Sequence, residues 1–263
     1  MLLIKIGGGA SINLPGIARD IKGLEDQIVI VHGANALRDS LARRLGVEKR
    51  ILTSVSGISS VYSDEEMIDV MLMAYSGLRN KRIVELLHQH GVNAIGLSGL
   101  DGAMVRGTRN KGIRVRERGK TLIRRDLSGK PVAVNRKLLG LLLENDFTPV
   151  ITAPIIDERN AAINSENDDV VTLLAHALSP DWVIQLIEAP GLLRDPEDPT
   201  SVVPTIAPDE VARWEDQKSS RMTRKMKAIC RVVRPGVTRV LIADGRRASP
   251  ITNAMAGHGT VVA

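Results

Sequence analysis

The sequence predicts an α/β protein of three layers, in which helices cover both faces of a mostly parallel sheet of about eight strands. Short apolar runs alternate with segments of helical periodicity along the chain, as in repeated strand–helix–strand units. The length of 263 residues suits one large domain or two lobes that share a sheet. Aromatic residues make up only 2% of the chain, so the core must be aliphatic.

The first half of the chain contains several expected elements. Strands are expected at residues 2–6, 28–31, 92–97 and 149–152. Helical spacing of apolar residues is found at 17–24, 37–45, 67–74, 80–90 and 138–143. Ser63 precedes Glu66 by three residues, which predicts a capping box at the start of the third helix. Gly91 is expected to end the fourth helix, and residues 103–127 to contain a basic β-hairpin.

The second half continues the alternation, with a helix at 170–178, a strand at 182–187, a helix at 222–233 and a strand at 239–243. A lobe boundary is expected near residue 150, which divides the chain into residues 1–150 and 151–263. Cys230 is the only cysteine, which excludes an internal disulfide and indicates a reducing compartment. Its place in an apolar helical pattern indicates a packing role.

The net charge of +6 is partly concentrated in one segment. Nine Lys and Arg residues and one acidic residue, Glu117, lie between Arg106 and Arg125. The segment is either a solvated surface or a docking site for a nucleotide, a nucleic acid or an acidic protein. The low aromatic content argues against base stacking. The apolar run at 2–6 is too short for a signal sequence or a membrane span.

Two expected strands end directly in loops of small residues, Lys5-Ile-Gly-Gly-Gly9 and His32-Gly-Ala-Asn35. Ligands bind at the carboxyl ends of strands in open parallel sheets, and glycine lets backbone amides approach a phosphate. One such loop is usually a tight connection, but two on consecutive strands, with Lys5 beside the first, favour a phosphate site. Ile12 stands where a dinucleotide fingerprint needs its third glycine, and no P-loop sequence is present.

Other candidate residues are weak when they are considered alone. Residues 164–169 precede a helix and would indicate an N-terminal cap, and Lys225 would indicate a surface lysine. No group of His and Cys residues has metal-ligand spacing, so no side chain is expected to bind a metal.

Together, however, the motifs follow one another in a recognisable order. They are Lys5-Ile-Gly-Gly, Val31-His-Gly, Val92-Asn-Ala-Ile-Gly-Leu, Asn164-x-x-x-Asp168, Pro190-Gly-Leu-Leu-x-Asp195, Met222-x-x-Lys225 and Ala243-Asp-Gly245. In this order they resemble the amino acid kinase family, and acetylglutamate kinases over the whole chain. Three further features are similar to the branch that phosphorylates 2-aminoadipate or glutamate attached to an amino-group carrier protein. They are Gly96-Leu-Ser-Gly-Leu-Asp-Gly102, the basic hairpin and the ending Gly257-His-Gly-Thr-Val-Val262.

The resemblance implies a carbamate kinase-like fold and transfer of the γ-phosphoryl group of ATP to a carboxylate, with Mg²⁺ bridging the phosphates. Lys5 and Lys225 would hold the transferred group from two sides, and Asp168 would orient the two ammonium groups. The N-terminal lobe would bind the acyl substrate through Ala34, Asn35 and Asn164. The C-terminal lobe would bind the nucleotide, bordered by Glu188 and Asp195. Backbone amides that would bind phosphate belong to Gly7, Gly8 and Gly33.

The chain departs from the family pattern at several positions, which leaves the substrate open. Val61 stands where the family has an arginine that grips the substrate carboxylate, and valine cannot make a charge-assisted bond. Ala34 and Asn35 follow Gly33 in place of a further glycine. Ile187-Glu188 replaces a Ser-Asp pair, and Ser220-Arg221 replaces a glycine before Met222.

We therefore expect a cytoplasmic kinase of lysine or arginine biosynthesis that acts on aminoadipate or glutamate linked to a small acidic carrier protein. The carrier would dock on Arg106 to Arg125, because a free acylated amino acid would not need so many cations. The alternatives are a kinase of free N-acetylglutamate and an inactive nucleotide-binding or nucleic-acid-binding regulator. The family resemblance also favours a homodimer.

Overall fold

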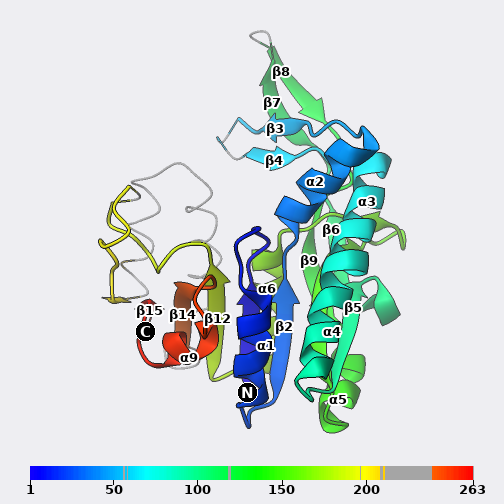
Figure 1. Ribbon diagram of the computed structural model, residues 1–263. Helices are drawn as coiled ribbons and strands as arrows, with labels where there is room; N and C mark the ends of the chain where they lie inside the picture. The colour runs from blue at the N-terminus through cyan, green and yellow to red at the C-terminus, as the bar shows by residue number, and fades with distance from the viewer. Residues whose placement is uncertain are drawn as a thin grey trace.

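The computed structural model describes residues 1–55, 57, 59–117, 120–195, 197–207, 210 and 239–262 (Figure 1). The predicted helix at 222–233, with Lys225 and Cys230, lies outside these residues, as do Ser220 and Arg221. In the described part, strands and helices alternate as the apolar periodicity predicts, which confirms the α/β class.

The centre of the protein is a sheet in which 11 strands are found among the described residues. Its order is β13-β15-β14-β12-β1-β2-β10-β6-β9, and β5 and β11 also pair with β10. Most pairs are parallel, as predicted, and the antiparallel ones are β14–β15, β6–β9 and β10–β11. The sheet is larger than expected because short strands such as β11 and β13, of two residues each, carry no periodic signal. The strands are β1 (Leu2–Ile6), β2 (Ile28–His32), β5 (Ala94–Gly99), β6 (Val105–Arg109), β9 (Gly129–Val134), β10 (Thr148–Ile156), β11 (Ala162–Ile163), β12 (Trp182–Ile187), β13 (Thr205–Ile206), β14 (Arg239–Asp244) and β15 (Thr260–Val262).

Helices cover both faces of the sheet, so the three-layer prediction is confirmed (Figure 1). One face packs against α1 (Leu14–Lys22), α4 (Asn80–Gln89) and α9 (Pro250–Met255). The other packs against α5 (Arg136–Glu144) and α6 (Asn167–Leu178). Side chains alternate along a strand, so Leu2, Ile4 and Ile6 of β1 enter the first core and Leu3 enters the second. Lys5 consequently lies on the α6 side of the sheet.

A long helical segment runs beside the sheet without a break. It consists of α3 (Glu65–Met71), a π-helical segment η1 (Leu72–Arg79) and α4. The predicted capping box is wrong, because Asp64 is the N-cap and accepts a hydrogen bond from the Met67 amide at 3.0 Å. Ser63 instead donates through Oγ to the Val61 carbonyl. Gly91 has φ of 80°, as expected of a residue that ends a helix.

Two β-hairpins stand beyond the sheet at the top of Figure 1, above α2 (Asn35–Leu45). One pairs β3 (Ile51–Thr53) with β4 (Ser59–Val61), and the other pairs β7 (Ile113–Glu117) with β8 (Lys120–Arg124). The second confirms the predicted basic hairpin. The hairpins join where the Val55 amide donates to the Arg114 carbonyl at 2.8 Å. A short 3₁₀ turn, η2 (Asp101–Ala103), connects β5 to β6.

The predicted lobe boundary near residue 150 falls inside β10, at the middle of the continuous sheet, and stays a prediction. Among the helices of the described residues, none is both long and apolar enough to cross a membrane.

Candidate functional site

The glycine loops after β1 and β2 touch each other backbone to backbone. A Cβ added to Gly33 would come within 3.1 Å of the Gly8 Cα and N. A Cβ added to Gly8 would come within 2.7 Å of the Ala34 nitrogen and 2.8 Å of the Asn35 nitrogen, where α2 begins. The Gly8 carbonyl accepts a hydrogen bond from Ala36 at 3.0 Å. Side chains are therefore excluded from this contact, and the start of α2 faces the first loop.

Only one of the three predicted phosphate-binding amides is available as expected. The Gly7 amide donates to the Leu186 carbonyl at 2.9 Å, and the Gly33 amide donates to the Ile6 carbonyl at 3.0 Å. The prediction that these two amides face a ligand is wrong, because the sheet hydrogen bonding continues one residue past β1 and β2. The Gly8 amide donates to no other described residue.

Lys5 forms a buried ion pair with Asp168 beside these loops. The distance from Nζ to Oδ1 is 2.8 Å, and the two side chains are 7% and 18% exposed. Lys5 is brought there by its place near the end of β1, on the face covered by α6, and Asp168 by the first turn of α6. Two segments far apart in the sequence thus place a cation and a carboxylate at the edge of the sheet where ligands bind in such folds.

The predicted acyl-binding residues lie near the same edge, where each contacts a neighbouring segment. Ala34 is buried, and the Oδ1 atom of Asn35 lies against Gly8, 2.1 Å from where a Cβ would be. The Nδ2 atom of Asn164 donates to Ser63 Oγ at 3.0 Å. Asn164 therefore connects the segment before α6 to the segment before α3.

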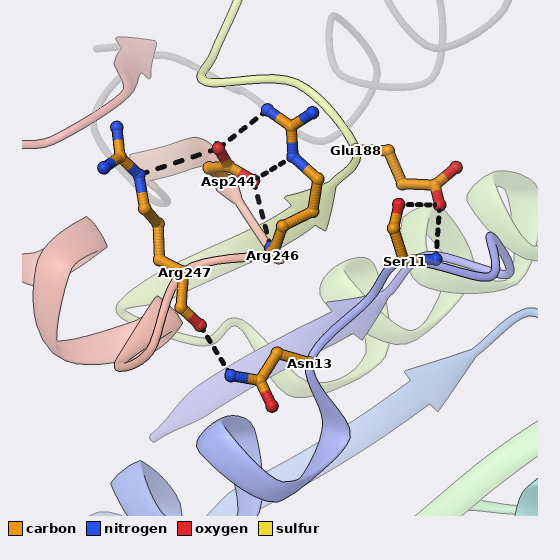
Figure 2. Close-up of polar contacts among 6 residues, drawn as sticks. All are labelled: Ser11, Asn13, Glu188, Asp244, Arg246 and Arg247. Atoms are coloured by element: carbon orange, nitrogen blue, oxygen red, sulfur yellow. Dashed lines mark hydrogen bonds and ion pairs between the residues drawn. The ribbon is translucent and has the colours of Figure 1, made fainter.

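The end of β12 reaches the first glycine loop through Glu188. Its Oε1 atom accepts hydrogen bonds from the Ser11 amide at 2.9 Å and from Ser11 Oγ at 2.5 Å (Figure 2). A Cβ on Gly9 would lie 2.0 Å from the Glu188 carboxylate, so the carboxylate rests directly on the loop. Asp195 lies further along the chain, where its Oδ1 accepts a hydrogen bond from the Glu197 amide within an exposed loop.

A charged cluster at the end of β14 was not predicted from the sequence. Arg246 donates to both carboxylate oxygens of Asp244, through Nε at 2.7 Å and Nη2 at 2.8 Å (Figure 2). Burial alone would raise the pKa of Asp244, but the hydrogen bonds from Arg246 hold that pKa below its usual value. Asn13 Nδ2 donates to the Arg247 carbonyl at 2.8 Å, which ties this turn to the start of α1. The motif Ala243-Asp-Gly245, which follows an expected strand, was the signal for this position.

The buried ring of His32 contacts the second glycine loop. Burial lowers the pKa of His32 to about 3, so its ring is neutral. Asn80 Nδ2 donates a hydrogen bond to Nε2 of His32 at 3.1 Å, so the ring proton is on Nδ1. Nδ1 lies 3.3 Å from the Gly33 carbonyl and can donate to it. The histidine thus links η1 and α4 to the loop after β2.

Val61 has an apolar environment. It is half-buried and packs against the cluster formed by Ala42, Met67 and Val70. The position of the family arginine is therefore part of a small hydrophobic core between β4, α2 and α3.

Comparison with known proteins places this geometry in one family. The amino acid kinase family matches residues 1–244. A LysW-aminoadipate kinase of Thermus thermophilus is 39% identical over the whole of both chains. A LysW-aminoadipate kinase of Deinococcus radiodurans is 35% identical over the whole of this chain and 91% of its own. N-acetylglutamate synthase of Neisseria gonorrhoeae has a similar fold, with a TM-score of 0.79 and 19% identity over 100% of this chain and 59% of that one. Giardia carbamate kinase has a TM-score of 0.68 and 13% identity, over 99% and 97% of the two chains. The chain belongs to the amino acid kinase family.

Proposed function

We propose that this protein transfers the γ-phosphoryl group of ATP to the side-chain carboxylate of aminoadipate or glutamate that is linked to a LysW-type carrier protein. Relatives named as kinases of such substrates are similar to this chain over its full length. The structural observation that carries the proposal is the buried ion pair of Lys5 and Asp168 beside the two touching glycine loops.

The arrangement suits phosphoryl transfer, which depends on positioning and on neutralising charge. Lys5 supplies a fixed ammonium group, and Asp168 holds it in one orientation. The Gly8 amide and the start of α2 offer donors to phosphate oxygens, in a space that no side chain can fill. Lys225 is proposed as the second cation, from outside the described residues.

The nucleotide and its metal fit this site in different ways. Among the described residues no group of three or more His, Cys, Asp or Glu side chains could hold a metal ion. Mg²⁺ is therefore proposed to arrive on the phosphates of ATP, which is its usual mode in such enzymes. ATP supplies the transferred group when bound. We assign residues 151–263 to the nucleotide, with Glu188 and Asp195 at its border, and residues 1–150 to the acyl substrate, with Ala34, Asn35 and Asn164. Gly7 and Gly33 contribute by their lack of a side chain.

The carrier is proposed to dock on the basic hairpin. Arg114 and Arg116 are exposed on one side of β7, and Val115 between them is buried and pairs with Ser54, the residue after β3. Arg109 does not belong to this surface, because its guanidinium is paired with the buried Asp157 at 2.9 Å. An acidic partner is favoured over a solvated face, because clustered like charges repel one another unless they are compensated.

A homodimer and a place in the cytoplasm are further proposals, which rest on the family resemblance. A kinase of free N-acetylglutamate is the second candidate, and it requires another cation to replace the arginine that is absent at Val61.

Trapping of the acyl phosphate as a hydroxamate tests the proposed reaction. Carrier-linked aminoadipate and glutamate should give hydroxamate that depends on Mg-ATP and on Lys5. Acetylated amino acids serve as the comparison. Absence of hydroxamate with every acceptor would exclude a carboxylate kinase.

A further inference from the structure

We propose that Arg79 is a positioning residue of the phosphoryl-transfer site. Its guanidinium group lies next to the glycine loop after β1 and favours binding of the terminal phosphate of ATP. The inference rests on the proposed function and adds a third cation to the site. No motif in the sequence pointed to this residue.

The π-helical segment places Arg79 at the loop. Arg79 is the last residue of η1. π-helical turns are rare in proteins, and those that occur often lie at functional sites. The next residue, Asn80, is fully buried, and its Nδ2 atom donates to the Val150 carbonyl at 2.9 Å as well as to His32. The end of η1 is therefore fixed against β2 and β10. From there the Nη2 atom of Arg79 reaches the Gly7 carbonyl at 3.4 Å.

The guanidinium of Arg79 is poorly compensated where it lies. Its Nε atom is buried without a hydrogen-bond partner. The guanidinium group forms no ion pair with the carboxylate of a described residue. Burial lowers the pKa of Arg79, and the negative charge of Glu188 acts in the opposite direction. A half-buried cation whose Nε atom lacks a hydrogen-bond partner is costly, so such a group indicates an anionic ligand.

The position of Arg79 complements that of Lys5. Lys5 lies on the α6 side of the sheet, whereas α4, which continues the helix of Arg79, packs on the opposite face. The loop that begins at Gly7 is consequently approached by one cation from each layer. A phosphate on this loop would be attracted from both sides, and the attraction would grow with the charge of the phosphate chain.

The alternative is that Arg79 only holds the Gly7 carbonyl and stabilises the fold. A structural role of this kind would change the melting temperature and would weaken ATP and ADP equally. An electrostatic role should weaken ATP more than ADP, since the two nucleotides differ by the terminal phosphate. The ratio of the two affinities separates these roles.

The test is calorimetric titration of the full chain with Mg-ATP and Mg-ADP. Arg79→Met should weaken ATP binding about tenfold more than ADP binding, and Arg79→Lys should restore part of the difference. Arg82→Met is the matched control, because Arg82 lies in the same helix and is exposed, in an ion pair with Glu85. It should leave both affinities unchanged.

Two results are decisive. If wild-type protein does not bind Mg-ATP, the proposed function fails. If wild-type protein binds Mg-ATP and the ATP-to-ADP ratio is the same in Arg79→Met, the inference about Arg79 fails alone. Should Arg79→Met not fold, Arg79→Gln carries the same comparison, because glutamine can still donate to the loop without a charge.

Discussion

The Lys5–Asp168 ion pair allows stability and catalysis to be separated by mutation. Asp168→Ala leaves the ammonium of Lys5 buried without this partner, and Lys5→Met removes the ammonium itself. The double variant Lys5→Met/Asp168→Leu replaces both charges by apolar groups of similar size. Each variant changes the same 2.8 Å contact in a different way.

The expected magnitudes follow from the burial of the two side chains, which are 7% and 18% exposed. Breaking a buried pair from one side costs about 3 kcal/mol, whereas replacing both partners is close to neutral, within about 1 kcal/mol. For a chain of this size a loss of 3 kcal/mol corresponds to a fall in Tm of roughly 6–12 °C. All three variants should lose kcat, by about a hundredfold for Lys5→Met, because the cation beside the transferred phosphoryl group is absent or displaced.

Urea unfolding and steady-state kinetics on the same samples provide the measurement. Glu85→Ala is a suitable control, since its pair with Arg82 is 63% and 48% exposed and should contribute less than about 1 kcal/mol. A stabilising role for the pair is excluded if Asp168→Ala costs no more than Glu85→Ala. A role of Lys5 in catalysis is excluded if the stable double variant keeps wild-type kcat.

Further predictions concern the glycine loop, the basic hairpin and a buried histidine. Gly8→Ala should abolish the thermal shift caused by Mg-ATP, because its Cβ would lie 2.7 Å from a backbone nitrogen. At Gly9 the nearest atoms that an added Cβ would meet are at the end of the flexible Glu188 side chain, so Gly9→Ala should keep the shift. Changing Arg114 and Arg116 to glutamate should raise KM for carrier-linked substrate but not for ATP. Steady-state kinetics at two ionic strengths measure this, and an unchanged KM for the carrier-linked substrate would contradict docking of the carrier on the hairpin. The pKa of His32 is about 3 in the fold and 6.5 when unfolded, so the unfolded chain takes up a proton first as the pH falls. The free energy of unfolding should therefore decrease from pH 6.5 to 3, and less steeply in His32→Gln.

Apolar periodicity was enough to predict the main elements. The strands Leu2–Ile6 and Trp182–Ile187 have the bounds expected from their apolar runs. Their burial on both faces is what a central strand of a parallel sheet requires. The position of Lys5 at the carboxyl end of β1 followed from the same reasoning.

The errors arose where long-range contacts decide the outcome. Ser63 and Asp64 can both cap a helix, and Ser63 is diverted by Asn164, about a hundred residues away in the chain. The Gly7 amide is used by the sheet because β12 extends beside it, which no local pattern reveals. The position of Arg79 likewise depends on how η1 packs against β10.

We claim that the substrate is linked to a carrier, and a comparison of kcat/KM values between linked and free substrates decides this. ADP release should be measured with carrier-linked aminoadipate, carrier-linked glutamate, and the two free N-acetylated amino acids. We predict that a carrier-linked substrate is preferred by at least about tenfold, since the carrier adds its own contacts to the site. Equal or greater kcat/KM with free N-acetylglutamate would contradict the claim.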